Sequence, residues 1–418
     1  MKQQVSATRA GIGLIVLVIL SADPASASAG QGQRLGNPTA PIVLNANGPQ
    51  PIRVVPIAGG LANPWSIAFL PDGRTMLVTE RAGRLRIIRD GVLDRQVVWE
   101  APEPPASAPL PGGPGAGDRL HFVAVHPQFA QNRLVYLSYP KSGERGETLA
   151  VARGRLDGSA LTNVDEIFVA DAWETGGNLA GRVFFGPDNM LYVTIGDRDR
   201  VCCNGTDDTS LRMKAQALDN HVGKTLRLRD DGSVPPDNPF VGNPGARPEI
   251  FTYGHRNGYG LAFHPETGEL WQAEIGPLGG DEINILKPGR NYGWPLVSTG
   301  RNYTGTLVSE QPWFRPGMEM PRIFFVPSVS PSSIVFYTGD QFPAWKNSLI
   351  VGELTTRQLQ VILFNQPSQA ERRVSLLSEL GVRIRDVQQG PDGNLYVATE
   401  MGLGGGEDGT VLRIEPVR

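Results

Sequence analysis

The sequence predicts an all-β protein built as a six-bladed β-propeller. One strand–turn–strand phrase recurs six times along the chain, and segments with helical periodicity are scarce. The two cysteines are too few for a disulfide scaffold or a multi-cysteine zinc site, so a hydrophobic core must hold the fold. Each repeat has room for two more strands, which gives the four strands of a propeller blade. A β-sandwich is the alternative, but it does not require such regular units.

The repeated phrase is an apolar strand, a turn rich in Pro, Asp and Gly, and a second apolar strand. Proline presets φ, Asp caps its own backbone, and glycine accepts positive φ, so the chain reverses between the two strands. The six copies cover residues 65–73 with 76–79, 123–127 with 134–137, 183–188 with 191–194, 261–265 with 270–273, 334–339 with 349–351, and 387–393 with 395–398. These units predict the six blades in chain order.

The first 29 residues have the order of a secretory signal peptide. Lys2 and Arg9 precede an apolar run over 11–20, and small residues follow over 25–30. An uncleaved anchor is the alternative, but a run of about ten apolar residues is short for a bilayer span. We therefore expect residues 1–29 to be removed, leaving a soluble protein that is periplasmic or secreted and has no membrane span.

The remainder is expected to form one domain. Residues 30–50 resemble an extended lead-in, and 51–418 form the propeller, whose ring closes when 410–414 pairs with an amino-terminal strand. Two inserts, 101–118 and 201–219, are expected to be loops, and the second holds the vicinal pair Cys202-Cys203. That pair can close a strained ring or stay reduced.

Composition excludes several partner classes. The chain of 418 residues is 40% hydrophobic, which is enough to fill a large core. Its 39 basic and 42 acidic residues nearly balance, so the chain has no net positive charge that would attract nucleic acid or an anionic membrane.

Polar residues and glycine are densest between 220 and 300. Arg256-Asn257 offers a cation and an amide to a planar anionic ligand. The stretch 274–282 offers carbonyl and carboxylate oxygens, which are the ligands that calcium prefers. Each of these motifs, taken singly, can also be explained as turn residues of a β protein. The residues alone therefore leave open whether the motifs bind a ligand or only form turns.

Taken together, these motifs resemble the soluble quinoprotein glucose/sorbosone dehydrogenase family, which includes periplasmic aldose sugar dehydrogenases. The likeness runs from 62–65 to 413–416, and its most specific motifs are 220–228, 231–240, 253–257, 274–277, 280–284 and 291–295. The resemblance implies a six-bladed propeller that binds pyrroloquinoline quinone (PQQ) and calcium in its channel. It also implies oxidation of the anomeric hydroxyl of an aldose to a lactone, with the electrons passed to an acceptor.

The resemblance also assigns residues. Arg256 and Asn257 occupy the family's quinone-contacting pair, and Asp281 matches a nearby acidic position. The metal ligands would be the backbone carbonyls of Gly276 and Pro277. The pair that grips the carboxylates of the cofactor would be Arg383 and Arg385, which alternate and so lie on one face of a strand.

Four positions depart from the family pattern. Asn178 stands where the family has its histidine general base, and an amide cannot accept a proton at ordinary pH. Thr355 stands near a quinone-contacting lysine of some relatives, and Tyr259 follows the Arg-Asn pair where Pro-Gln is usual. Ile275 replaces a frequent histidine.

A replacement base can be sought elsewhere. His121 lies beside the proline-rich insert, where relatives usually carry an apolar residue, so His121 or the neighbouring Asp118 is a candidate. A packed or surface histidine is the simpler interpretation. The sequence therefore predicts a PQQ-dependent sugar or alcohol dehydrogenase. Two alternatives are a propeller that has lost this chemistry and binds a carbohydrate or protein, and a calcium-dependent hydrolase or lactonase.

Overall fold

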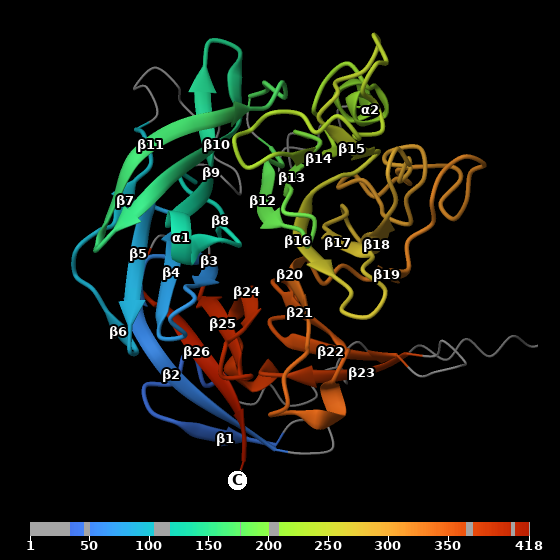
Figure 1. Ribbon diagram of the computed structural model, residues 1–418. Coiled ribbons are helices and arrows are strands. Elements are labelled where there is room, and N and C mark those ends of the chain that lie inside the picture. The colour runs from blue at the N-terminus through green and yellow to red at the C-terminus, as the bar shows by residue number, and fades with distance from the viewer. Residues whose placement is uncertain are drawn as a thin grey trace, which may run out of the picture. The chain divides into compact units, whose positions relative to one another are not determined.

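Six antiparallel sheets form the blades of a propeller in the computed structural model of the chain (Figure 1). The structure describes residues 34–45, 51–103, 118–175, 177–199, 209–364, 371–402 and 406–417. The propeller belongs to the compact unit Leu35–Arg418. The predicted signal peptide, the pair Cys202-Cys203 and most of the proline-rich insert lie outside the described residues.

The first three blades follow one another along the chain, and each begins with its innermost strand. Blade 1 comprises β3 (Pro64–Phe69), β4 (Thr75–Glu80), β5 (Arg84–Arg89), β6 (Val92–Leu93) and β7 (Trp99–Glu100). Blade 2 comprises β8 (Val123–Val125), β9 (Leu134–Gly143), β10 (Gly146–Asp157) and β11 (Ala160–Val169). Blade 3 comprises β12 (Ala180–Phe185), β13 (Leu191–Ile195), β14 (Lys224–Leu228) and β15 (Ile250–Tyr253).

The other three blades complete the ring. Blade 4 comprises β16 (Gly258–Phe263), β17 (Leu270–Glu274), β18 (Asp281–Leu286) and β19 (Ile323–Phe325). Blade 5 comprises β20 (Pro331–Phe336), β21 (Leu349–Glu353), β22 (Leu359–Phe364) and β23 (Glu371–Leu376). Blade 6 comprises β24 (Arg383–Gln389), β25 (Leu395–Glu400), β26 (Gly409–Pro416), β2 (Ile52–Leu61) and β1 (Ile42–Leu44). All six predicted strand pairs are therefore confirmed.

The turns inside the blades form as their sequences predict. Asp72 accepts the backbone N–H groups two and three residues further on at 3.0 and 2.9 Å, and Gly73 has a φ of 73°. Asp392 and Gly393, whose φ is 78°, repeat this turn in blade 6. In blade 2 the Nδ1 of His126 takes the place of the Asp oxygen and accepts the N–H two residues on at 2.9 Å. This local chemistry explains why the sequence repeat marks the blades so well.

Blade 6 closes the ring as predicted. The carboxy-terminal β26 pairs with the amino-terminal β2, with Ile414 opposite Val54. The described part of the predicted lead-in adds β1 to the same sheet, since Val43 pairs with Arg53. The lead-in therefore contributes an edge strand to the propeller.

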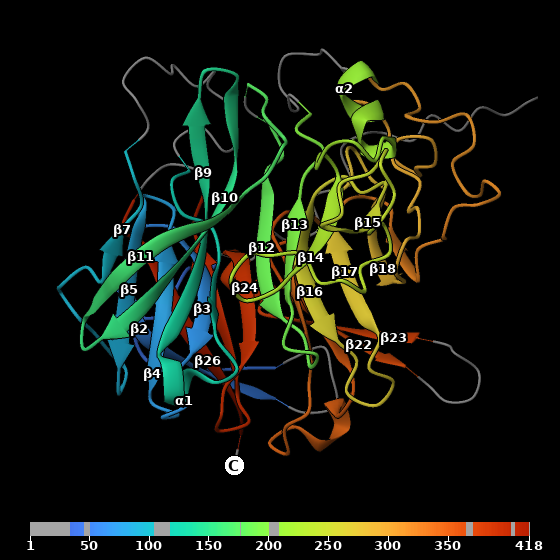
Figure 2. The same ribbon diagram turned by 45° about the horizontal axis from the view of Figure 1, so that its top comes forward.

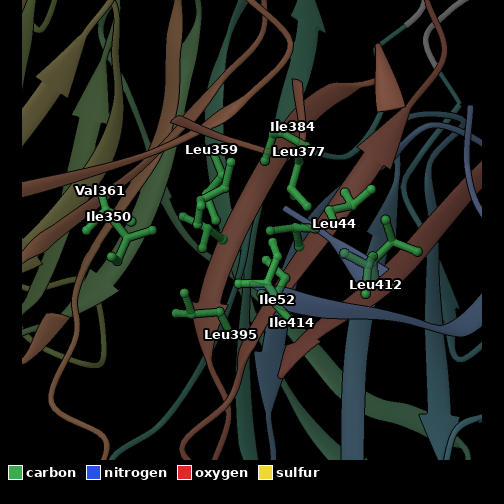
Figure 3. Packing of buried hydrophobic residues seen from close by; sticks show 14 of the residues in the cluster. Leu44, Ile52, Ile350, Leu359, Val361, Leu377, Ile384, Leu395, Leu412 and Ile414 are labelled. Atoms are coloured by element: carbon green, nitrogen blue, oxygen red, sulfur yellow. The ribbon is translucent and has the colours of Figure 1, made fainter. Parts of the chain in front are cut away.

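One hydrophobic cluster fills each gap between neighbouring blades. The cluster between blades 5 and 6 includes Ile350, Leu359, Ile384 and Leu395, which Figure 3 shows interlocking between the two sheets. Five further clusters fill the other gaps. Burial of apolar side chains on both faces of each sheet thus stabilises the ring.

Helices in the described part of the chain are short. They are α1 (Phe129–Asn132), α2 (Thr209–Met213) and three 3₁₀ turns at Lys214–Gln216, Pro343–Trp345 and Ser378–Leu380. The described part of the insert 201–219 contains α2 and the first 3₁₀ turn, so the expectation of a loop throughout this insert was wrong. No helix within the described ranges is long and apolar enough to cross a membrane.

The innermost strands surround a central axis. β3, β8, β12, β16, β20 and β24 each contact the next in a closed circle (Figure 1). Figure 2 shows the arrows of β16 and β24 pointing the same way, with α2 at the end of the ring where these strands begin. Residues at the starts of the innermost strands therefore lie at one mouth of the propeller.

Candidate active site

The predicted site residues lie at this one mouth. Asn178 comes just before β12, Arg256 and Asn257 come just before β16, and Arg383 begins β24. His121 comes just before β8. Positions spread over more than 260 residues of sequence are thus brought together by the repeat.

Arg383 and Arg385 both reach one carboxylate, although a bulge between Ile384 and Asp386 interrupts the regular pairing of β24 with β25. The Nε of Arg383 and the Nη2 of Arg385 donate to the same carboxylate oxygen, Oε1 of Glu400, at 2.7 and 2.6 Å. Burial alone would raise the pKa of Glu400, but the two guanidinium groups outweigh it and lower the pKa. Two cations share one carboxylate, so one positive charge remains available for an anionic ligand.

Trp65 joins this arginine pair to the next blades. The Arg385 guanidinium carbon lies 4.1 Å from the centre of the Trp65 ring, and the His121 ring stacks on the same indole at 4.7 Å. The Tyr259 ring lies 6.1 Å from Trp65. Burial raises the pKa of the Tyr259 hydroxyl, and Arg385 opposes that shift. Trp65 is therefore a central member of the site that motif comparison did not assign.

His121 is buried and neutral. Its Nδ1 lies 3.0 Å from the carbonyl oxygen of Ala180, which can only accept, so Nδ1 carries the proton and Nε2 holds the lone pair. Burial, together with Arg385 and Arg81, lowers the pKa of His121 to about 3 against the opposing effect of the Ala180 bond. Asp118 is paired with Arg81 and lies 4.0 Å from the Nε2 of His121. At neutral pH the imidazole is uncharged and a weak base.

Asn178 is held in a chain of polar side chains. Its Nδ2 donates to Oδ1 of Asp197 at 2.9 Å, and its Oδ1 accepts from Nδ2 of Asn257 at 3.3 Å. The indole Nε1 of Trp294 donates to the other oxygen of Asp197 at 2.8 Å. Burial raises the pKa of Asp197, and Arg256 opposes that shift. The structure thus fixes the Asn178 amide against a buried carboxyl group.

Arg256 reaches one of the two predicted metal-binding carbonyls, that of Gly276. Its Nη1 donates to the carbonyl oxygens of Ile275 and Gly276, both at 2.8 Å. Its backbone N–H donates to Oε2 of Glu274 at 2.8 Å, and its guanidinium lies 5.5 Å from the centre of the Trp294 ring. The Arg-Asn pair and the Gly-Pro pair are therefore parts of one arrangement.

Asp281 supports this arrangement from beneath. One oxygen accepts the N–H of Gly276 at 2.8 Å, and the other accepts three donors of residues 328–330, each at 2.7 Å. Thr355 bonds through its hydroxyl to that of Ser330 at 2.7 Å. Four hydrogen bonds occupy the Asp281 carboxylate, which gives this residue a positioning role. Burial raises the pKa of Asp281, against these bonds.

Sequence reasoning singled out Glu274 but did not recognise that it belongs to a set of strand-end carboxylates. In four of the six blades the last residue of the second strand is a buried glutamate, and in a fifth a buried aspartate follows two residues after the strand. These residues are Glu80, Glu274, Glu353 and Glu400, and Asp197. Each accepts hydrogen bonds at the same mouth or beside it. The signal was present in five of the six repeats, because an acidic residue stands at or just after the end of the second apolar strand.

The donor set suits an anionic planar ligand. Within the described ranges, buried polar atoms without a hydrogen-bond partner include three donors, the Nε of Arg256, the Nε of Arg385 and the Nε1 of Trp65, and one acceptor, the Oδ1 of Asn257. Such atoms are costly unless a ligand or water satisfies them. PQQ, a planar tricarboxylate, fits this set. Calcium fits only together with such an anion, because the Gly276 carbonyl already accepts from a cation and the nearby Asp281 and Glu274 carboxylates already accept hydrogen bonds.

A cleft of about 310 Å³ lies beside this site. Its lining includes Arg212, Pro295 and Leu296, and the Arg212 guanidinium lies 5.4 Å from the centre of the Trp294 ring. Arg212 also donates to Oδ2 of Asp199 at 2.8 Å. The cleft therefore gives a small polar molecule room next to Trp294 and Arg256.

Comparisons with known proteins identify the family of the chain. The family model for glucose/sorbosone dehydrogenase matches residues 61–413. Aldose sugar dehydrogenase YliI of Escherichia coli (strain K12) is 38% identical over 378 residues, covering 88% of this chain and 94% of that protein. Quinoprotein glucose dehydrogenase B of Acinetobacter calcoaceticus is 29% identical over 414 residues, covering 82% and 84%.

A solved structure extends the likeness to three dimensions. The PQQ-bound form of aldose sugar dehydrogenase from Streptomyces coelicolor superposes with a TM-score of 0.66 at 27% identity, covering 90% of this chain and 99% of that one. The family match spans all six blades and every residue of the mouth described above. The chain belongs to the glucose/sorbosone dehydrogenase family.

Proposed function

We propose that the protein is an exported quinoprotein that oxidises an aldose sugar or related alcohol with PQQ and calcium and passes the electrons to an external acceptor. One observation carries the proposal: the excess positive charge and the unpartnered donors of Arg256 and Arg385 lie at a single mouth. The PQQ-bound relative supports the choice of anion. The signal-like first 29 residues support export to the periplasm or beyond.

The residues divide the work of binding. Arg383 and Arg385 would neutralise cofactor carboxylates, Arg256 and Asn257 would orient the cofactor ring, and Tyr259 and Thr355 would complete its surroundings. The carbonyls of Gly276 and Pro277 would hold calcium together with the anion, and Asp281 fixes the Gly276 backbone. PQQ, when bound, supplies the two-electron acceptor for the sugar.

The proton from the sugar hydroxyl needs an acceptor. Asn178 cannot serve, since its amide only donates to Asp197 and accepts from Asn257. His121 has a lone pair on Nε2, but its ring is buried against Trp65 and its pKa is about 3, so it is a weak base. Replacing His121 with alanine tests it, because unchanged turnover eliminates this residue as the base.

The geometry of Asn178 favours a second candidate function, a propeller that binds quinone or carbohydrate without turnover. Both polar atoms of this amide are engaged, so nothing at the family's base position takes up a proton. A calcium-dependent hydrolase requires several carboxylates that converge on one ion. Over the ranges that the structure describes, no group of three or more His, Cys, Asp or Glu side chains is placed to hold a metal.

Titration and turnover together separate these functions. Purified protein is titrated with PQQ with and without calcium, and a panel of aldoses and alcohols is then supplied with an artificial electron-accepting dye. Arg383→Gln should weaken quinone binding at least tenfold, because it removes a charged hydrogen bond. Arg413→Gln on the outer part of blade 6 is the matched control. Binding with dye reduction supports the dehydrogenase, binding without reduction supports the second candidate, and no binding contradicts both quinone proposals.

A further inference from the structure

Exposed large hydrophobic side chains gather on one segment of the propeller. Of the fourteen such side chains in the part of the chain that the structure describes, seven lie between residues 278 and 326. Six of them define what we call the apolar patch: Leu278, Leu307, Trp313, Phe314, Phe324 and Val326, which are 45–61% exposed. Grouped exposure of this kind marks an interaction surface, whereas single exposed side chains need no explanation.

Backbone bridges and side-chain contacts link members of the patch in pairs. Leu278 and Leu307 both pair with Arg301 through backbone bridges. A side chain at Gly279 would lie 3.8 Å from Val326, and the Trp313 ring lies 5.3 Å from that of Phe324. These contacts join the loop between β18 and β19 to the turn that follows β17, at the right of Figures 1 and 2.

The patch begins where the candidate active site ends. Leu278 directly follows Pro277, whose carbonyl is a proposed calcium ligand, and the ring of Pro277 lies 2.9 Å from where a side chain at Gly300 would be. The next residue, Arg301, donates its N–H to the carbonyl of Leu278 at 3.0 Å. A molecule seated on the patch therefore lies beside the proposed cofactor.

The composition and charge of the segment describe the occupant. Trp, Phe and Arg are the residues enriched at protein–protein interfaces, and Lys and Glu are depleted there. The segment 287–322 carries five Lys or Arg and two Glu, on a protein whose net charge is −3. Arg301 and Arg315 are exposed and pair with no carboxylate of the described residues. This apolar surface with a positive rim complements a partner with an apolar surface and a negative rim.

We propose that the apolar patch is the docking surface for the electron acceptor, a small acidic one-electron metalloprotein. The inference rests on the proposed function, which requires an external acceptor. Each aldose gives up two electrons and two protons on becoming a lactone, so two oxidised acceptor proteins are reduced by one electron each and two protons are released. An interface of this kind is small and short-lived, as is usual for redox partners.

Oxidised plastocyanin, an acidic copper protein, is the probe. Its binding to the protein without cofactor is measured first, and its reduction during aldose turnover is then followed by the loss of its blue absorbance. The double variant Trp313→Ser/Phe314→Ser should weaken binding and slow plastocyanin reduction at least tenfold, while dye reduction changes less than twofold. Arg301→Glu/Arg315→Glu should have a similar effect and flatten the salt dependence. Val92→Ser, at a side chain 69% exposed on blade 1, is the matched control.

The outcomes are distinct. Plastocyanin binding and reduction that are unchanged in both patch variants overturn the docking surface. A second result would also overturn it: sedimentation shows that the protein is a dimer, and Trp313→Ser/Phe314→Ser dissociates the dimer without slowing plastocyanin reduction. The patch would then be an interface between copies of the chain. Patch-dependent binding by a protein that reduces no dye supports the surface and refutes the dehydrogenase. Patch-dependent binding and reduction support both.

Discussion

Removing the charge of Glu400 tests how the arginine pair is balanced. In Glu400→Gln the shape of the side chain is kept, but Arg383 and Arg385 lose the only carboxylate to which they donate hydrogen bonds among the described residues. Arg385 is almost fully buried, with its side chain 5% exposed, so water cannot replace the lost charge. Both cations are then left uncompensated beside Trp65.

The magnitude follows from burial. Breaking a buried ion pair by removing one partner costs about 3–5 kcal/mol. At an unfolding entropy of about 2.1 cal/mol/K per residue, roughly 380 folded residues give about 0.8 kcal/mol/K, so the melting temperature should fall by roughly 4–6 °C. The folded pKa of Glu400 is lowered, so its charge stabilises the protein above the unfolded pKa near 4.5. This contribution disappears as the pH falls through the folded pKa.

Thermal unfolding at pH 7 and at pH 3.5 is the assay. Glu415→Gln is the matched control, since Glu415 pairs with Arg53, whose side chain is 46% exposed, and such a pair is worth less than about 1 kcal/mol. The rise in melting temperature on adding PQQ should also differ between the two proteins. It should be smaller in Glu400→Gln if PQQ binding needs the arginine pair held in place by Glu400, and larger if PQQ itself supplies the missing negative charge. A Glu400→Gln melting temperature within 1 °C of the wild type at pH 7, or a larger deficit at pH 3.5 than at pH 7, would refute the reasoning.

Three further predictions concern the mouth of the ring. Asn178→His should raise sugar-dependent dye reduction about 100-fold, because an imidazole bonded to Asp197 supplies a general base, with Asn178→Gln as the control; equal rates in the two variants contradict this. His121→Phe keeps the ring stack on Trp65. When the pH is lowered from 6.5 to 4, this variant should lose less free energy of unfolding than the wild type, by up to about 1.4 kcal/mol per pH unit. The reason is that His121 binds a proton in the unfolded wild type but not in the folded one, where its pKa is about 3. Urea unfolding at the two pH values checks it, and parallel losses speak against a buried neutral imidazole. Asp281→Asn should lower the free energy of unfolding by about 2–4 kcal/mol and weaken calcium-dependent quinone binding, because an amide N–H then faces backbone N–H donors. The control Asp340→Asn, at an exposed position, should change neither quantity.

Much of the fold could be predicted because its signals are local. A turn such as Asp72-Gly73 is specified by the residues in it, and the six turns mark the six blades. The closure of blade 6 followed from the need to cover sheet edges. The short helix α2 was missed, since five residues are too few to show helical periodicity.

The site was only partly predictable. Motifs and alternation placed Arg383 and Arg385 together, but their shared partner Glu400 lies on the neighbouring strand, and only the register of β24 against β25 brings it opposite. Asp197 was missed for the same reason, since its contact with Asn178 depends on the pairing of β12 with β13. Side chains that meet across strands are fixed by register, which residue types alone do not give.

The pairing of β2 with β26 has a consequence for biogenesis. Blade 6 takes strands from both ends of the chain, so its sheet cannot assemble until Gly409–Pro416 has been synthesised. A chain that stalls or is trimmed before residue 409 exposes unpaired backbone on β2 and β25, which invites association with other chains. Nascent protein is therefore expected to remain incompletely folded until Gly409–Pro416 has been synthesised.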